Sequence, residues 1–391
     1  MKKRASAIFF TAVQIGLMVL FPFAADAATF SIPEKKSDAT VVPINASSYA
    51  SLLLLDPSSG KVLYESNADK TWVPASLTKM MTCTVFDSTP TNWNAKASIL
   101  KQDEVGGGRL QVPSGSVMTL KDILFSAIVG SANNAAMALG RLFDGKGMSA
   151  FIQKMNAASE SYGLAKTSFH DAAGMDPKNT TSAYDVASLM IISERTDVVR
   201  QAMTTAHYLF TTSHPVIKKD IKNTNDILLN DSDIIVTGGK TGFIYESKYN
   251  LAVRAYPKGE PAKELLVVVL GANTRESSFT AARSLLRWGW SNFTWNASVS
   301  AGFRQNLAKG DRGSDVQALQ KYLNTHGYPV AKTGAGSSGR ETQLFGDATK
   351  AALIRFQQAH AKDILASHDA TKASGYLDVY TRGYLNKPLG N

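Results

Sequence analysis

Residues 72–82 read WVPASLTKMMT, and the rest of the predicted fold is organised around them. Pro74 disfavours helix in the residue before it and fixes its own φ angle, so a helix is predicted to begin just after it. Ser76 suits the start of that helix, where its hydroxyl would face backbone N–H groups that lack a partner. The helix also has an apolar surface that would bury it in a core. This surface is formed by Leu77, Met80, Met81 and Phe86.

Lys79 lies three residues after Ser76, so its amine and the serine hydroxyl share one face of the predicted helix. A serine hydroxyl is a weak nucleophile at neutral pH, and a nearby neutral amine can accept its proton. A lysine amine is neutral at that pH only if burial or a second cation lowers its pKa. The pair therefore predicts a catalytic serine, a lysine base and another cation close to both.

The Ser-x-x-Lys spacing alone is weak, because it also occurs at Ser58–Lys61 and Ser98–Lys101. The first of these copies lies in a turn between two predicted strands, and the second lies in a polar region without an apolar helix. Only the copy at Ser76 combines a helix start with a surface that would be buried.

The N-terminus has the pattern of an export signal. Three basic residues precede a long apolar stretch at residues 5–25, and Ala25-Asp26-Ala27 then offers a small-x-small cleavage site. We therefore predict a signal peptide at residues 1–27 and an exported protein, periplasmic or attached to the cell wall. The alternative is an uncleaved membrane anchor, because the apolar stretch is close to the length that spans a bilayer.

Composition narrows the function further. The 391 residues are too many for one ordinary core, so two domains are expected. Cleavage after residue 27 removes three basic residues and one acidic residue, which changes the formal net charge from +10 to +8. Such a charge suits an anionic polymer outside the cytoplasm, although solubility alone could also explain it. Nothing indicates a nucleic acid as partner.

Cysteine and histidine usage is sparse. The single cysteine, Cys83, excludes an intramolecular disulfide, and its place on the Ser76 helix predicts a buried core residue. The six histidines have neither metal-ligand spacing nor cysteine companions, so we predict no metal and no cofactor.

The pattern of residues 46–295 indicates one mixed α+β domain with an antiparallel sheet flanked by helices. Strands are predicted at residues 51–55, 61–65, 234–243, 251–255 and 265–270. Helices are predicted after Pro74, after a Thr119 cap, and at residues 149–162, 183–193 and 281–290. Residues 28–45 and 296–305 are interpreted as linkers.

Two further short motifs lie on suitable elements. A glycine corner at Gly130 can direct Ser131 and Asn133 at a common cleft, although the same residues are also ordinary capping residues. A β-branched run then leads into Lys240-Thr241-Gly242-Phe243, where glycines permit close approach of another backbone or a ligand. A second Lys-Thr-Gly at residues 332–334 lies in a glycine-rich loop without a strand, and the glycine run at residues 106–108 is interpreted as a flexible turn.

Taken together and in this order, the three motifs resemble those of the serine D-alanyl-D-alanine carboxypeptidases, the low-molecular-mass penicillin-binding proteins. The resemblance covers residues 51–290. It also includes Gly174 and Asp176, residues 182–185 (SAYD), 223–225 (NTN) and 237–243 (TGGKTGF). It implies the penicillin-binding-protein and β-lactamase type of fold.

The resemblance also implies roles for the residues of the three motifs. Ser76 would attack the carbonyl between two D-alanines, Lys79 would accept its proton, and Lys240 would be the cation that keeps Lys79 neutral. Ser131 would relay a proton to the leaving amine, and Asn133 would hold both the peptide and Lys79.

The remaining implied residues bind substrate. Backbone N–H groups of Ser76 and Phe243, next to Gly242, would form an oxyanion hole. Thr241 would bind the terminal carboxylate. Some relatives also bind this carboxylate with an arginine. Arg275 is the candidate for that arginine here, and the alternative is a role on the surface.

Between Asn133 and Lys240 the chain lacks the Glu-x-x-Leu-Asn sequence with which class A β-lactamases activate water. Fast hydrolysis of β-lactams is therefore not expected, and these compounds should act as covalent inhibitors.

Residues 306–391 resemble the small three-helix peptidoglycan-binding module. The helices are predicted to begin after a Ser314 cap, within residues 345–349 and after residues 375–378, and the last to end near Leu385. The expected function is thus a wall-directed D,D-carboxypeptidase acting on peptidoglycan stem peptides, with glycan strands as a second partner and no stable membrane anchor after signal cleavage. The alternatives are a D,D-endopeptidase that cleaves cross-links and a non-catalytic wall-binding protein.

Overall fold

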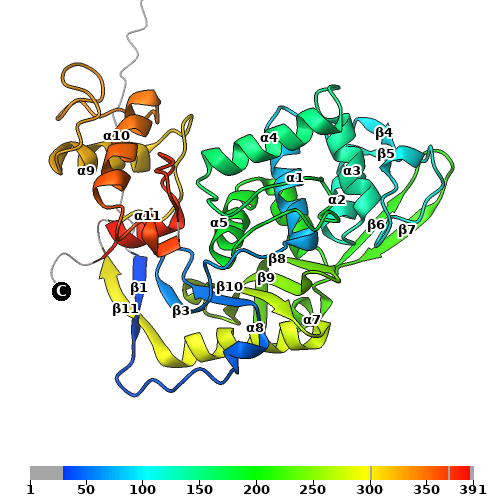
Figure 1. The fold of residues 1–391 in the computed structure, drawn as a ribbon, viewed down its shortest axis with the longest axis horizontal. Helices are drawn as coiled ribbons and strands as arrows, with labels where there is room; N and C mark the ends of the chain where they lie inside the picture. Colours follow the sequence, from blue (N-terminus) through cyan, green and yellow to red (C-terminus); the bar gives the residue numbers. More distant parts are fainter. Residues whose placement is uncertain (1–29, 300–301, 369, 388–391) are drawn as a thin grey trace, which may run out of the picture.

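The structure, a computed structural model, describes residues 30–299, 302–368 and 370–387. The predicted signal peptide lies outside these residues. A five-stranded antiparallel sheet in the order β3-β2-β10-β9-β8 forms the centre of the first domain (Figure 1). Its strands are β2 (Ser51–Leu55), β3 (Val62–Ser66), β8 (Ile234–Ile244), β9 (Lys248–Pro257) and β10 (Leu265–Ala272).

Helices cover both faces of this sheet. Helix α8 (Arg275–Asn292) lies along one face, and a cluster of helices lies on the other (Figure 1). The cluster comprises α1 (Thr78–Phe86), α2 (Leu120–Ile128), α3 (Asn133–Leu142), α4 (Met148–Ser161), α5 (Ala183–Ser193) and α6 (Asp197–Thr204). Because successive side chains of a strand point to opposite faces, Leu53 joins the core of the helix cluster and Leu54 joins the core beneath α8. The predicted mixed α+β fold is confirmed.

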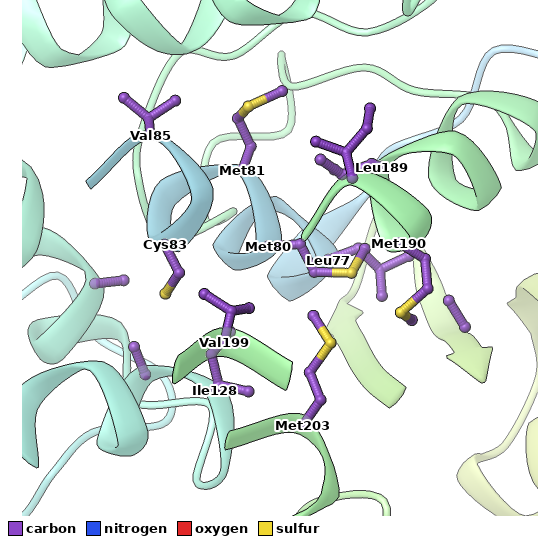
Figure 2. Packing of buried hydrophobic residues seen from close by; sticks show 14 of the residues in the cluster. Leu77, Met80, Met81, Cys83, Val85, Ile128, Leu189, Met190, Val199 and Met203 are labelled. Carbon is purple, nitrogen blue, oxygen red and sulfur yellow. The ribbon is translucent and has the colours of Figure 1, made fainter. Parts of the chain in front are cut away.

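Helix α1 is the buried centre of the helix cluster. All nine of its residues are buried, and Met80, Met81 and Cys83 pack among side chains of α2, α5 and α6 (Figure 2). Cys83 is therefore a core residue, as predicted.

Smaller elements surround these layers. Hairpin-like pairs are formed by β4 (Lys96–Ser98) with β5 (Val117–Thr119) and by β6 (His207–Thr211) with β7 (Lys218–Lys222), and α7 (Asp226–Leu229) precedes β8. Strand β1 (Phe30–Lys35) pairs antiparallel with β11 (Phe293–Val299). Both segments interpreted as linkers therefore contain strand residues: β1 lies within residues 28–45, and β11 extends into residues 296–305. The pair was missed because its two strands lie far apart in the chain and no local pattern marks them.

The C-terminal helices are α9 (Ser314–Thr325), α10 (Asp347–Ala359) and α11 (Val379–Leu385). They enclose a core of their own that includes Leu319, Leu353 and Phe356. The predicted Ser314 cap is wrong, since Gly313 is the N-cap residue and Ser314 begins the helix. We call residues 306–391 the C-terminal module; the division of the chain into domains remains a prediction.

Several predicted bounds in the first domain are close to those observed. Thr119 caps α2 as expected, accepting a hydrogen bond from the backbone N–H of Asp122. The last helix of this domain is longer than predicted and begins at Arg275, because Thr274 supplies the cap by accepting from the Ser277 N–H.

Leu54 tests how much the sheet depends on its contact with α8. Its side chain is fully buried and lies beside Gly289 of that helix. We expect Leu54→Ala to lower the free energy of unfolding of this domain by about 3 kcal/mol, measured by urea denaturation. Leu209→Ala, which truncates a leucine that is 72% exposed, should change it by less than about 0.5 kcal/mol. Equal losses in the two variants would contradict this packing.

Candidate active site

The turn that carries Ser76 is held between two glycines. Residues Ala75–Leu77 form a 3-10 turn before α1, and Ala75 has a φ of +49°. A Cβ atom at Gly174 would lie 1.9 Å from the Ala75 carbonyl oxygen, and one at Gly242 would lie 2.8 Å from that of Pro74. Only glycine permits both approaches, so the backbone at the serine is fixed from two sides.

The predicted capping role of Ser76 is wrong. Leu77 is the N-cap residue of α1, and no side chain caps this helix. The Ser76 hydroxyl instead lies 2.8 Å from the Lys79 amine nitrogen. The helix start therefore serves to place the hydroxyl and the amine side by side.

Three contacts fix the amine of Lys79. Besides the Ser76 hydroxyl, they are the Asn133 Oδ1 atom at 2.7 Å and the Ala173 carbonyl oxygen at 2.6 Å. The orientation of the Asn133 amide follows from its other end, where Nδ2 donates to the Gly106 carbonyl at 2.8 Å. The Asn133 Oδ1 atom and the Ala173 carbonyl oxygen can only accept hydrogen bonds from Lys79. A neutral Lys79 amine has two hydrogens to donate to them, and its lone pair then faces the Ser76 hydroxyl.

Burial is the main cause of the lowered pKa of Lys79, which is reduced to about 7. The side chain is fully buried, which penalises the charged form, while Asp171 acts in the opposite direction. Repulsion between the Lys79 and Lys240 amines is the second cause, after burial, of the lowered pKa of Lys240. Each amine therefore disfavours the charged form of the other, and the expectation that Lys240 helps to keep Lys79 neutral stays a prediction.

Lys240 and Ser131 meet on the other side of the site. The Lys240 amine donates to the Ser131 hydroxyl and to the Thr241 carbonyl, both at 2.9 Å. Ser131 has a φ of +54°, a strained value for a residue with a side chain, and it lies at the corner between α2 and α3. The edge strand β8 therefore brings Lys240 against the corner that the sequence had indicated.

These groups open into one cleft with a volume of about 650 Å³. Ser76, Ser131, Asn133, Thr241, Gly242, Phe243 and Arg275 line it, whereas Lys79 and Lys240 lie buried behind it. All nine residues predicted for the site are thus brought together.

One end of the cleft is polar. The Thr241 hydroxyl donates to that of Thr224 at 2.6 Å, and the Thr224 carbonyl accepts from Arg275 at 2.9 Å. Arg275 also forms an ion pair with Asp226. Arg275 therefore belongs to the cleft wall, which disfavours the alternative of a purely surface role.

Sequence reasoning missed several residues that shape this site. Gly107 and Gly108, interpreted as part of a flexible turn, line the cleft, and a Cβ at Gly107 would lie 2.7 Å from the Asn133 amide nitrogen. Thr224 lies in the stretch 223–225 that carries the resemblance, but no role was predicted for it. The Ala173 carbonyl was missed, because its contact with Lys79 joins segments far apart in the chain and leaves no local signal.

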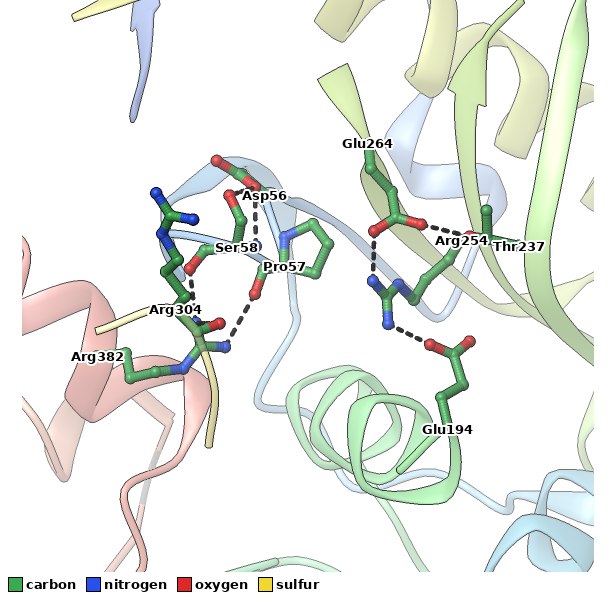
Figure 3. A network of polar contacts seen from close by, with 9 residues as sticks. All are labelled: Asp56, Pro57, Ser58, Glu194, Thr237, Arg254, Glu264, Arg304 and Arg382. Carbon is green, nitrogen blue, oxygen red and sulfur yellow. Dashed lines mark hydrogen bonds and ion pairs between the residues drawn. The ribbon is translucent and has the colours of Figure 1, made fainter. Parts of the chain in front are cut away.

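A buried ionic network supports the start of β8. Arg254 on β9 forms ion pairs with Glu194 and Glu264, and Glu264 accepts a hydrogen bond from Thr237 of β8 (Figure 3). Burial raises the pKa of Glu194 to about 7, with Arg254 acting against this shift. A Cβ at Gly238 would collide with the Glu194 carboxylate, so glycine is required two residues before Lys240.

In the part of the chain that the structure describes, no group of three or more His, Cys, Asp or Glu side chains is arranged to hold a metal ion. The chemistry of the site is instead that of a serine nucleophile with a lysine base. This combination, beside an antiparallel sheet with helices on both faces, defines a serine acyl-transfer enzyme.

Comparison with known proteins agrees with this class. The D-alanyl-D-alanine carboxypeptidase family matches residues 36–274, and the chain belongs to this family. The peptidoglycan binding domain family matches residues 312–361.

Three relatives illustrate the similarity. A D-alanyl-D-alanine endopeptidase of Escherichia coli is 30% identical over 277 residues, which cover 70% of this chain and 86% of that protein. The D-alanyl-D-alanine carboxypeptidase DacA of Haemophilus influenzae is 29% identical, with 73% and 74% covered. The solved Streptomyces K15 DD-transpeptidase shares the fold with a TM-score of 0.58 and 24% identity, over 64% of this chain and all of that chain.

Gly174 allows a test of how strictly the serine turn is positioned. Gly174→Ala should displace the Ala75 carbonyl and lower the rate of acylation by penicillin about 100-fold, measured by stopped-flow or labelling kinetics. Gly259→Ala is the matched control, since Gly259 also has a positive φ but nothing lies within 4 Å of its would-be Cβ. Similar rates in the two variants would show that the close approach to Ala75 does not matter.

Proposed function

We propose that this enzyme acts on peptidoglycan stem peptides as a serine D,D-carboxypeptidase and releases the terminal D-alanine. The observation that carries the proposal is the Lys79 amine, which lies 2.8 Å from the Ser76 hydroxyl, fully buried and with its two other hydrogen-bond partners uncharged. Such an amine can accept the serine proton near neutral pH. Membership of the carboxypeptidase family supports the same reaction.

Acylation would begin with attack of the Ser76 oxygen on the carbonyl between the two D-alanines while its proton moves to Lys79. The backbone N–H groups of Ser76 and Phe243 would stabilise the oxyanion. The close approach of Gly242 to the Ser76 nitrogen supports this role, since a Cβ there would lie 3.2 Å from it. The proton taken up by Lys79 would then pass through the hydroxyl of Ser131, which is hydrogen-bonded to Lys240, to the departing amine.

The polar end of the cleft suits the free carboxylate of the substrate. Thr241 would donate to it, and Lys240 and Arg275 would supply positive potential. Thr224 is hydrogen-bonded to both Thr241 and Arg275 and so would fix their positions relative to each other. Asn133 would contact the peptide as well as Lys79.

Water would then release the shortened peptide from Ser76. Because the chain lacks the Glu-x-x-Leu-Asn sequence between Asn133 and Lys240, we expect slow hydrolysis of the penicilloyl enzyme and hence stable inhibition by β-lactams.

Cleavage of cross-links is a second candidate function. It is favoured by the similarity to a protein named D-alanyl-D-alanine endopeptidase, of which this chain covers 86%. Both reactions break a bond to a D-alanine and would use the same groups. They differ in whether the leaving amine belongs to a free amino acid or to a second stem.

The same proposal places the protein outside the cytoplasm, in the periplasm or on the wall, with stem peptides and glycan strands as partners. The export pattern of residues 1–27 and the match to a peptidoglycan binding domain support this location. Within the described ranges, no helix has both the length and the apolar character needed to cross a bilayer.

Separate digestion of pentapeptide monomers and cross-linked dimers, followed by mass spectrometry, tests the proposal. We expect release of D-alanine from the monomer at a rate at least tenfold above cleavage of the dimer. Ser76→Ala should abolish both reactions and also labelling by fluorescent penicillin. Dimer cleavage without D-alanine release would favour the endopeptidase, and a folded wild type that takes no label would indicate a non-catalytic wall-binding protein.

The pKa of Lys79, about 7, predicts how acylation depends on pH. The base must be neutral, so the second-order rate of acylation by penicillin should rise about tenfold per pH unit below 7 and level off above it. A stopped-flow series from pH 5.5 to 9 measures this profile. A rate that is constant or falls across pH 7 would exclude Lys79 as the base.

A further inference from the structure

The C-terminal module is fixed to the first domain by a buried arginine. Arg382 of α11 is fully buried, and four of its five N–H groups donate hydrogen bonds (Figure 3). Two of the acceptors are the carbonyls of Pro57 and Ser58 in the β2–β3 turn, at 2.8 and 2.6 Å. Its pKa is lowered by burial only to about 10, so the side chain stays charged and depends on these carbonyls.

Close backbone contact strengthens this attachment. A Cβ at Gly383 of α11 would lie 2.7 Å from the Gly60 carbonyl oxygen, in the same turn. The Tyr380 hydroxyl donates to the Tyr184 carbonyl at 2.6 Å, and the rings of these two tyrosines pack edge to face. At the margin, Arg195 forms an ion pair with Asp311 at 2.7 Å. The module is therefore seated in one orientation.

This orientation creates a groove between the two domains with a volume of about 630 Å³. Helix α4 and the segment after it form one wall, with Asn156, Glu160 and Thr167. The module forms the other wall, with Lys350 and Lys372. Tyr162 and Tyr376 meet edge to face across the same junction, with ring centroids 5.4 Å apart.

We propose that this groove binds polymeric peptidoglycan, with Lys350 and Lys372 pairing with carboxylates of the polymer. Junctions between domains are common ligand sites, and two amines on one wall suit a polymer that carries acidic peptides. The choice of polymer rests on the match of the module to a peptidoglycan binding domain and, in part, on the proposed function. The rigid attachment keeps both walls of the groove in place.

Sedimentation of the mature full-length chain with insoluble, purified peptidoglycan sacculi tests the groove. The double variant Lys350→Ala/Lys372→Ala should raise the apparent dissociation constant about tenfold. Lys321→Ala/Lys332→Ala removes the same charge from two exposed positions of the module and should change it by less than twofold. Unchanged binding of the first variant, or an equal loss in the second, would overturn the proposal.

A second pair of variants opens the groove without altering its lysines. Gly383→Leu would clash with Gly60 and separate the walls, whereas Gly346→Leu places the same side chain where nothing lies within 4 Å of the new Cβ. We expect only Gly383→Leu to weaken binding to sacculi, by at least fivefold; wild-type binding by this variant would contradict the composite site. This experiment measures binding to sacculi, so its outcome does not depend on whether the catalytic site is active. Failure of the proposed function would be detected separately, by penicillin labelling.

Discussion

The hydrogen bonds of one buried amine are the constraint on which the catalytic site depends. Lys79 can be neutral near pH 7 because α1 is surrounded by core side chains and because its partners at Asn133 and Ala173 are uncharged acceptors. With its two hydrogens directed at these acceptors, the lone pair has only the Ser76 hydroxyl to face. Core packing and the proposed chemistry are therefore linked, because the same burial that stabilises α1 lowers the pKa of the proposed base, Lys79.

Glycines complete this arrangement, since several parts of the backbone must approach the site more closely than a Cβ allows. Gly174 and Gly242 enclose the serine turn, Gly107 contacts Asn133, and Gly238 leaves room for the Glu194 carboxylate under β8. A network around Arg254 holds the start of that strand, and Lys240 follows a few residues later. The residues predicted for the site come from four segments of the chain, and they can meet because glycines allow these backbones to approach closely.

The sequence predicted the sheet, the helix after Pro74 and seven of the residues that line the cleft, because each motif has a spacing tied to a regular element. It failed where the decisive partner is remote. Burial is the main cause of the lowered Lys79 pKa, and burial depends on the packing of the whole helix cluster. Likewise, Arg382 reaches the Ser58 carbonyl across 324 positions, and backbone carbonyls leave no sequence signal.

The pKa of Lys79, measured directly, tests the central claim. NMR of protein labelled with 13C-lysine, with the Lys79 signal assigned by its loss in Lys79→Arg, would follow the charge of this amine as pH changes. We expect the amine to titrate near pH 7 in the free enzyme. An amine that stays protonated up to pH 10 would contradict it, since Ser76 would then lack a base.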